Sequence, residues 1–293
     1  MKKLLLASTA VVMSAGVAAA DVALSGDAWM GIGYNNNAAQ KYMMISRARV
    51  TFTLSGETDG GMAFGGSFRA DNAVGAAAGT AGSVFISGDF GRLALGDVDS
   101  ALEATWFRTR HIGVLENAGG SRATSLGQGT APSALYTYEI DGFKVALGAS
   151  QFMSGAQNYS IGASYTIDGY GIALGYERNG AGSTHALLSG QVDFDPVSVR
   201  AFAGQVRVNA TDAVLAAATG VAAGDRGTQY GLDVHASFDG VGVQVRGKRD
   251  FAGANHLGAG VTYGLGGGAT LGASVNRVQG GNTTADFGLA FSF

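Results

Sequence analysis

The chain has 293 residues, of which 14% are charged and 49 are glycine, with only 2 prolines and no cysteine. The formal net charge of −3 leaves no basic surplus, so nucleic acid is not an expected partner. The lack of cysteine excludes disulfides and thiolate metal sites. The low charge content differs from soluble domains, in which about a quarter of residues are charged.

Residues 1–20 have the pattern of a secretory signal peptide. Lys2 and Lys3 form a basic start, Leu4 to Val17 is apolar, and Ala18 to Ala20 supplies small residues before a cleavage site. The apolar stretch is short and weakly apolar for a membrane helix of roughly 20 residues. We therefore expect two regions, a signal peptide over 1–20 and a single domain over 21–293.

The rest of the chain has strands with one apolar and one polar face. In Tyr42 to Leu54, Met44, Val50 and Phe52 share one face while Arg47 and Arg49 share the other. Similar alternation with a period of 2 recurs over Val197 to Ala203, Tyr230 to Phe238 and Val241 to Lys248. A soluble β-sandwich would show the same alternation, so this pattern alone does not decide the fold.

The spacing of the connections is more informative, because short and long ones alternate strictly. Seven tight turns rich in Asp and Gly fall near residues 58–61, 89–91, 141–142, 168–169, 195–196, 239–240 and 264–268. Eight longer connections lie at 35–41, 71–82, 98–133, 152–158, 179–183, 207–227, 251–255 and 278–282. Alternation of this kind is typical of outer-membrane barrels, which have short periplasmic turns and longer external loops. Fifteen connections predict an antiparallel, all-β transmembrane barrel of about sixteen strands, with fourteen or eighteen as alternatives, wide enough for a water-filled channel.

Aromatic residues lie where the membrane interface is expected. Phe64, Phe143, Phe194, Phe238 and Tyr263 adjoin tight turns on the apolar faces of their strands, which indicates an aromatic girdle at one headgroup level. The last strand alternates apolar Phe287, Leu289, Phe291 and Phe293 with smaller or polar residues. A terminal strand that ends on Phe resembles the signal that the barrel-assembly machinery reads.

Several stretches resemble the general porins of the Rhodobacter type, the Gram-negative porin family of alphaproteobacteria. They are Leu24-Ser25-Gly26-Asp27-Ala28, Ser46-Arg47-Ala48-Arg49-Val50, Phe64-Gly65-Gly66-Ser67-Phe68, Val84 to Gly91 and Leu135-Tyr136-Thr137-Tyr138. The resemblance implies a sixteen-stranded barrel, a homotrimer and a long third external loop folded into the pore. It also implies that wall arginines face loop carboxylates across the constriction.

The candidate pore-lining residues follow from this resemblance. On the wall, Arg47, Arg49 and Arg69 match the family's basic cluster, and alternation places them on the inner face. The third loop, Val98 to Ser133, is the longest connection, and structureless loops of that length are usually functional. It departs from the acidic family pattern, because Asp99, Glu103 and Glu116 are accompanied by Arg108, Arg110, His111 and Arg122. We therefore expect weak anion preference or near neutrality, and assign no divalent-ion site.

Other function classes are less favoured. No nucleophile motif accompanies the four histidines, so we expect neither an enzyme nor a cofactor. A substrate-specific channel, a structural or adhesive barrel, and a soluble secreted β protein are the alternatives. The leading hypothesis is an outer-membrane general diffusion porin that passes ions and small hydrophilic solutes, with the lipid of that membrane around it.

Overall fold

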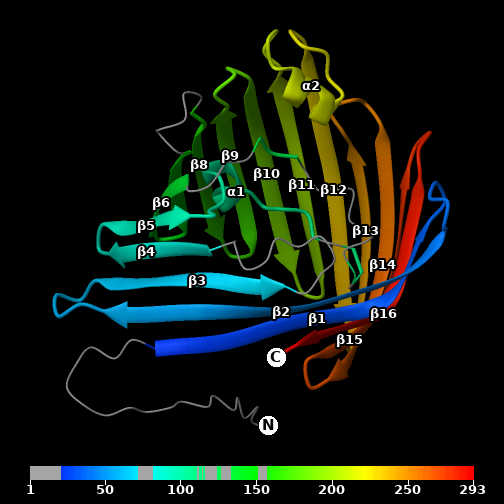
Figure 1. Cartoon of the computed structure of the whole chain (residues 1–293), viewed down its shortest axis with the longest axis horizontal. Helices are drawn as coiled ribbons and strands as arrows, with labels where there is room; N and C mark the ends of the chain where they lie inside the picture. Colours follow the sequence, from blue (N-terminus) through cyan, green and yellow to red (C-terminus); the bar gives the residue numbers. More distant parts are fainter. Residues whose placement is uncertain are drawn as a thin grey trace.

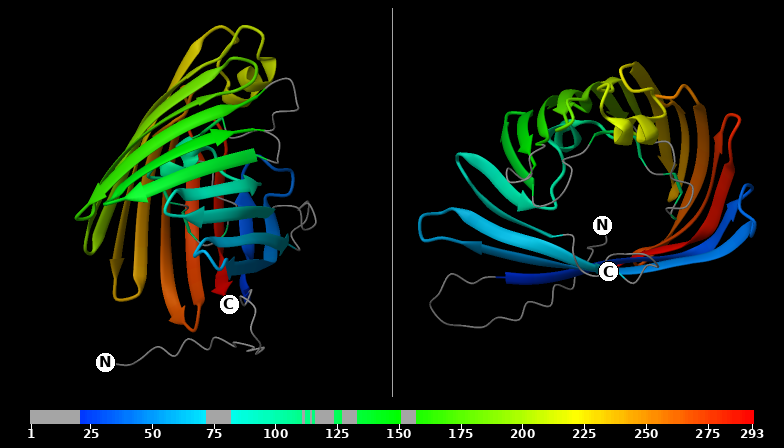
Figure 2. Two further views of the ribbon diagram at one scale, coloured as in Figure 1. Left: turned by 90° about the vertical axis from the view of Figure 1, so that its left-hand side faces the viewer. Right: turned by 45° about the horizontal axis from the view of Figure 1, so that its top comes forward.

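The fold is given by a computed structural model, which describes residues 21–71, 82–110, 112–113, 115, 124–126, 133–150 and 157–293. Within these residues, sixteen antiparallel strands close into a barrel in which each strand pairs with its neighbours in the sequence and β1 pairs with β16. Figure 1 shows the strands in chain order, and Figure 2 shows the ring that they form. The predicted fold class and strand number are confirmed.

The strand bounds agree with the predicted alternation of turns and loops. The first eight strands are β1 (Asp21–Asn35), β2 (Tyr42–Glu57), β3 (Ala63–Asp71), β4 (Gly82–Gly88), β5 (Gly91–Gly96), β6 (Ser133–Ile140), β7 (Phe143–Ala149) and β8 (Tyr159–Ile167). The other eight are β9 (Tyr170–Arg178), β10 (Thr184–Phe194), β11 (Val197–Arg207), β12 (Arg226–Phe238), β13 (Val241–Arg249), β14 (Asn255–Gly266), β15 (Ala269–Val278) and β16 (Thr283–Ser292). We call the two ends of the barrel the short-turn end and the long-loop end.

Backbone conformation explains the tightest turns. Asp141, Asp168 and Asp239 have φ values of 47°, 48° and 46°, and the glycine that follows each also has positive φ. Two successive residues of positive φ define the two-residue turn whose twist matches that of an antiparallel pair. Asp-Gly therefore closes these hairpins and fixes their register.

Two short helices lie in the connections of the described chain. α1 (Ala101–Thr105) begins at Ser100, which forms a reciprocal capping box with Glu103, and α2 (Ala213–Thr219) begins at Asp212. Asp212 is buried and accepts hydrogen bonds from Ser183 Oγ (2.7 Å), Asn179 Nδ2 (2.7 Å) and Leu215 N (3.0 Å). It thereby joins two neighbouring connections at the long-loop end. Among the described residues, no helix is long and apolar enough to cross a membrane.

The outer face of the barrel is an exposed apolar band. Large side chains on alternate residues are open to the surroundings, among them Ile172 (58% exposed), Leu174 (60%) and Val245 (56%). The five predicted girdle aromatics, Phe64, Phe143, Phe194, Phe238 and Tyr263, are all between 41% and 58% exposed. An apolar surface of this extent fits hydrocarbon rather than water. The intervening residues face the interior and are predominantly small, polar or charged.

Candidate functional site

The described residues of the long connection between β5 and β6 lie against the inner wall. Backbone N–H groups of Ala101 and Phe107 donate to wall hydroxyls, at 2.8 Å to Ser160 Oγ and 2.9 Å to Ser189 Oγ. Further along, Arg200 Nη1 donates to Arg108 O at 2.8 Å. These wall residues belong to β8, β10 and β11, so the connection crosses several strands on the side away from the apolar band (Figure 2).

A buried carboxylate on β9 joins two separate parts of this connection. Glu177 is 1% exposed and accepts hydrogen bonds from Ser100 Oγ and from Leu126 N, the latter at 2.7 Å. His185 Nδ1 lies 3.2 Å from the same carboxylate, and Gln229 completes the cluster by contacting His185 Nε2 at 3.2 Å. Gln229 also exchanges two hydrogen bonds with the backbone of Thr124. The cluster therefore anchors residues 100 and 124–126 to one place on the wall.

Apolar packing reinforces the anchor. Leu102 of α1 is fully buried and forms a cluster with Leu187 of β10 and Phe202 of β11, against which Trp106 packs. Burying a leucine side chain contributes about 1.5–3 kcal/mol. The helix is therefore held both by hydrogen bonds at its start and by packing along its length.

Glycines on the inner wall provide the space for the connection. A Cβ added at Gly175 would lie 2.5 Å from Leu102 Cγ, and one added at Gly31 would lie 2.6 Å from Leu115 Cδ1. The same close approach occurs at further inward glycines of β8, β9, β14 and β16. We call the set the glycine track, and its members are Gly31, Gly162, Gly171, Gly175, Gly258, Gly260 and Gly288. Because side chains of the connection fill the position of each missing Cβ, the track sets how close it approaches the wall.

The predicted wall arginines lie together on the inner face of β2 and β3. Arg47 Nη2 is 2.6 Å from Asp27 Oδ2, and Arg49 forms a bidentate pair with Asp71 at 2.7 and 2.9 Å. Arg69 Nε lies 3.7 Å from Asp71 Oδ2. Asp27 and Asp71 are wall residues, so wall carboxylates contribute to balancing this basic cluster, in addition to any contribution from the loop.

The predicted loop residues form a second charged group. Arg108 Nη2 lies 3.9 Å from Asp99 and 3.8 Å from Glu103, within the same connection. Arg110 lies 3.7 Å from Asp193 and 3.7 Å from the fully buried Asp233, both on the wall. Here the loop supplies the cation and the wall the carboxylates, the reverse of the polarity that the family resemblance implies. Glu116, Arg122 and His111 lie outside the described residues.

Burial raises the pKa of the Glu103 carboxyl above its ordinary value, although the hydrogen bond from Ser125 Oγ (2.7 Å) acts in the opposite direction. The charges of Asp99 and Glu177 add to the upward shift. In the part of the chain that the structure describes, no group of three or more His, Asp or Glu side chains could hold a metal ion.

Comparison with known proteins decides the family. Residues 7–285 match the family model described as Gram-negative porin. The chain belongs to the Gram-negative porin family. It is 34% identical over 308 residues to a porin of Rhodobacter capsulatus, covering 93% of this chain and all of that one.

Solved porin structures share the fold. A porin structure refined at 1.8 Å is 30% identical and superposes with a TM-score of 0.78, over 93% of this chain and 100% of that one. A triple mutant of the Rhodopseudomonas blastica porin superposes with a TM-score of 0.77 at 21% identity, again over 93% of this chain and 100% of that one. This second likeness supports the fold alone. Family and fold both indicate a channel of the Gram-negative outer membrane that ions and small solutes pass through.

Sequence reasoning missed the anchoring residues. Glu177 and Gln229 lie on the inward rows of β9 and β12. The alternation of residues along these strands predicts that both side chains face the interior, but no local sequence pattern indicates that they bind the connection. Helix α1 was also missed, although Ser100 and Glu103 carry the spacing of a capping box. Asp71 was assigned to a connection, whereas it ends β3 and pairs with Arg49.

Proposed function

We propose that this protein is a general diffusion porin whose constriction lies between the arginines of β2 and β3 and the connection over 97–132. Arg47, Arg49 and Arg69 form the wall side, and Asp99, Glu103, Arg108, Arg110, Glu116 and Arg122 form the loop side. The observation that carries the proposal is a polar inner face inside a barrel whose outer face is an apolar band. Such a barrel holds water in the interior and lipid outside.

The charge arrangement favours weak selectivity. Several described cations of the wall are paired with wall carboxylates, among them Arg47 with Asp27, Arg49 with Asp71 and Lys144 with Glu139. Paired charges leave a smaller net field for passing ions than a ring of one sign does. We infer weak anion preference or near neutrality.

Three further parts of the proposal rest on family resemblance and sequence pattern. Residues 1–20 direct export and are removed, the long-loop end faces outward, and the barrel forms a homotrimer after insertion by the assembly machinery. Small outward side chains such as Ala28 and Ala48 suit close contact between protomers.

The test is conductance of the purified mature protein in a planar bilayer with a salt gradient. Stepwise currents in groups of three with a small reversal potential are the expected result. Replacing Arg47, Arg49 and Arg69 by Gln is expected to move the reversal potential toward cation preference. The matched control is Lys144→Gln, an inward cation at the short-turn end, for which we expect a smaller shift. Folded protein that gives no current would reject a porin function in favour of a closed structural or adhesive barrel.

A further inference from the structure

The outward rows of the strands contain charge in one place only. Within the described strands, the outward-facing residues include five arginines and no Lys, Asp or Glu. The arginines are Arg178, Arg207, Arg226, Arg249 and Arg277, on β9, β11, β12, β13 and β15. On β9 the outward row is Tyr170, Ile172, Leu174, Tyr176 and then Arg178, so the arginine continues the apolar row. We call these five residues the arginine belt.

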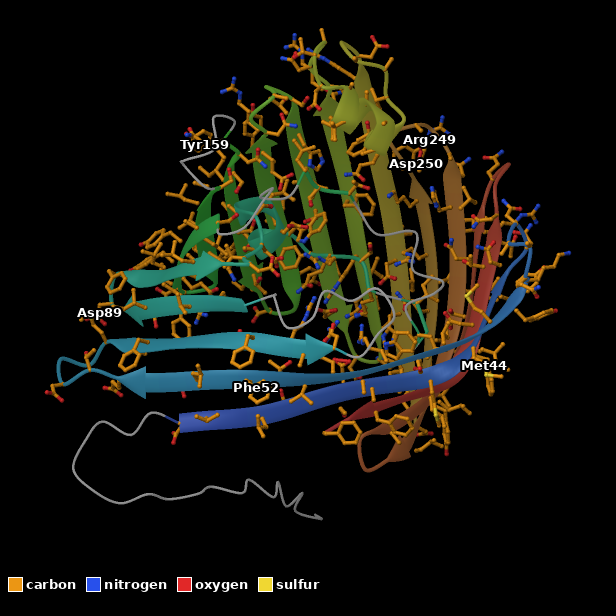
Figure 3. All side chains as sticks on the ribbon, viewed as in Figure 1. Met44, Phe52, Asp89, Tyr159, Arg249 and Asp250 are labelled. Carbon is orange, nitrogen blue, oxygen red and sulfur yellow. The ribbon has the colours of Figure 1, made fainter. Side chains whose placement is uncertain are left out.

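All five lie at the same end of the barrel. Each is the first, last or next-to-last residue of its strand on the long-loop side. Arg249 and Tyr159 lie at the long-loop ends of their strands, with Asp250 directly after Arg249, whereas Asp89 lies in the short turn between β4 and β5 (Figure 3). The short-turn end has exposed aromatics such as Phe194 and Phe238 on its outward rows instead. The belt is thus confined to the long-loop end of the barrel and to the half formed by β9 to β15.

Register brings three belt residues into one line. Arg178 pairs with Thr184 of β10, Thr184 pairs with Arg207, and Arg207 pairs directly with Arg226. Like charges directly opposite on neighbouring strands destabilise a sheet. No carboxylate lies on the described outward rows to offset this repulsion, and Arg178, Arg207 and Arg226 are exposed. An anion bound between these arginines would remove the destabilisation that their repulsion causes.

The surroundings indicate that such an anion belongs to a lipid. Below Arg249, a hollow of about 560 Å³ on the outer face is lined by apolar groups including Tyr230, Leu232 and Leu257. It exists because Gly247 has no side chain, and a Cβ there would meet only Leu257 Cδ2 at 3.6 Å. A ligand with a phosphate at the belt and a hydrocarbon chain in this hollow would match both parts of the surface.

We propose that the arginine belt binds the phosphate groups of anionic lipids that surround the long-loop end of the barrel. Arginine suits this role because its planar guanidinium binds phosphate through two parallel hydrogen bonds. Each cation near an anionic lipid surface contributes roughly fivefold in affinity, so three adjacent arginines contribute on the order of a hundredfold. The belt does not face the lumen, so its role is separate from conduction.

The test uses the full barrel in mixed micelles of neutral detergent with phosphatidic acid or phosphatidylcholine, and counts retained lipids by native mass spectrometry. The variant Arg178→Gln, Arg207→Gln, Arg226→Gln is expected to bind phosphatidic acid on the order of a hundredfold more weakly than the native protein. The same three residues changed to Lys should remain within about tenfold, because the charge is kept. Lys41→Gln, a cation of the loop between β1 and β2, is the control for net charge and should change little.

Folding and conduction are followed in parallel. Heat-modifiable migration and bilayer conductance should be unchanged in the Gln variant, so loss of binding would not reflect a misfolded barrel or a failed channel. Equal retention of phosphatidylcholine and phosphatidic acid by the native protein would overturn the proposal. So would undiminished binding by the Gln variant, or displacement of the lipid by inorganic phosphate at equal concentration, which would indicate a site for soluble anions.

Discussion

Glu177 offers the most direct test of how the connection over 97–132 is held to the wall. Its buried carboxylate accepts one hydrogen bond from Ser100 and one from the backbone of Leu126. Hydrogen bonds to a charged group contribute about 1.5–3 kcal/mol each, so Glu177→Ala removes roughly 3–6 kcal/mol of attachment. It also leaves His185 without its carboxylate partner. We expect the connection to leave the wall far more often.

Hydrogen exchange measured on peptides that cover residues 97–110 would report this opening. A loss of 3 kcal/mol corresponds to exchange roughly a hundredfold faster, provided the connection opens locally. Single-channel recordings should show more frequent fluctuations of the open current. Glu177→Gln keeps an acceptor oxygen, so its exchange rate should lie between that of the native protein and that of Glu177→Ala.

The matched control is Glu139→Ala. Glu139 is also an inward strand carboxylate with a cationic partner, Lys144 Nζ at 2.7 Å, but it is 64% exposed and bonds to no described residue of the connection. Exposed pairs contribute about 0–1 kcal/mol, so exchange over 97–110 should not change. If Glu177→Ala also leaves that exchange unchanged, the buried cluster does not hold the connection and the reasoning fails.

Three further outcomes are expected. Leu102→Ala should lower the free energy of unfolding or of loop detachment by about 2–5 kcal/mol, measured by denaturant titration and exchange, and a value near zero would contradict a packed cluster. Gly258→Val places a side chain where Ile112 now lies, so the open-channel conductance should change, whereas the outward Gly247→Val should leave it unaltered. Burial acts to raise the pKa of Asp212, but its three hydrogen bonds outweigh this and hold the pKa below its ordinary 3.8. The stability that it contributes is therefore present above pH 3.8 and lost as the pH falls through the lowered value; Asp212→Asn should remove this dependence from exchange over 208–225.

The periodic features of this protein are determined by local sequence. Alternation of apolar and polar residues fixes which side chains face lipid, because the side-chain period of a strand is 2. Asp-Gly pairs such as Asp141-Gly142 fix the hairpins, because both residues adopt positive φ. These local patterns predict about sixteen strands, the aromatic girdle and the inward position of Arg47, Arg49 and Arg69.

The partners of those side chains were decided by tertiary structure alone. Glu177 and Leu126 are far apart in the chain, and the path of the connection that follows β5 across the inner face of the sheet brings Leu126 to β9. The same holds for Arg110 beside Asp233, whereas the alignment of Arg207 with Arg226 comes from the register of the consecutive strands β11 and β12. The alternation of residues along a strand determines which way a side chain points, whereas the strand register and the path of the loop determine which residues it contacts there.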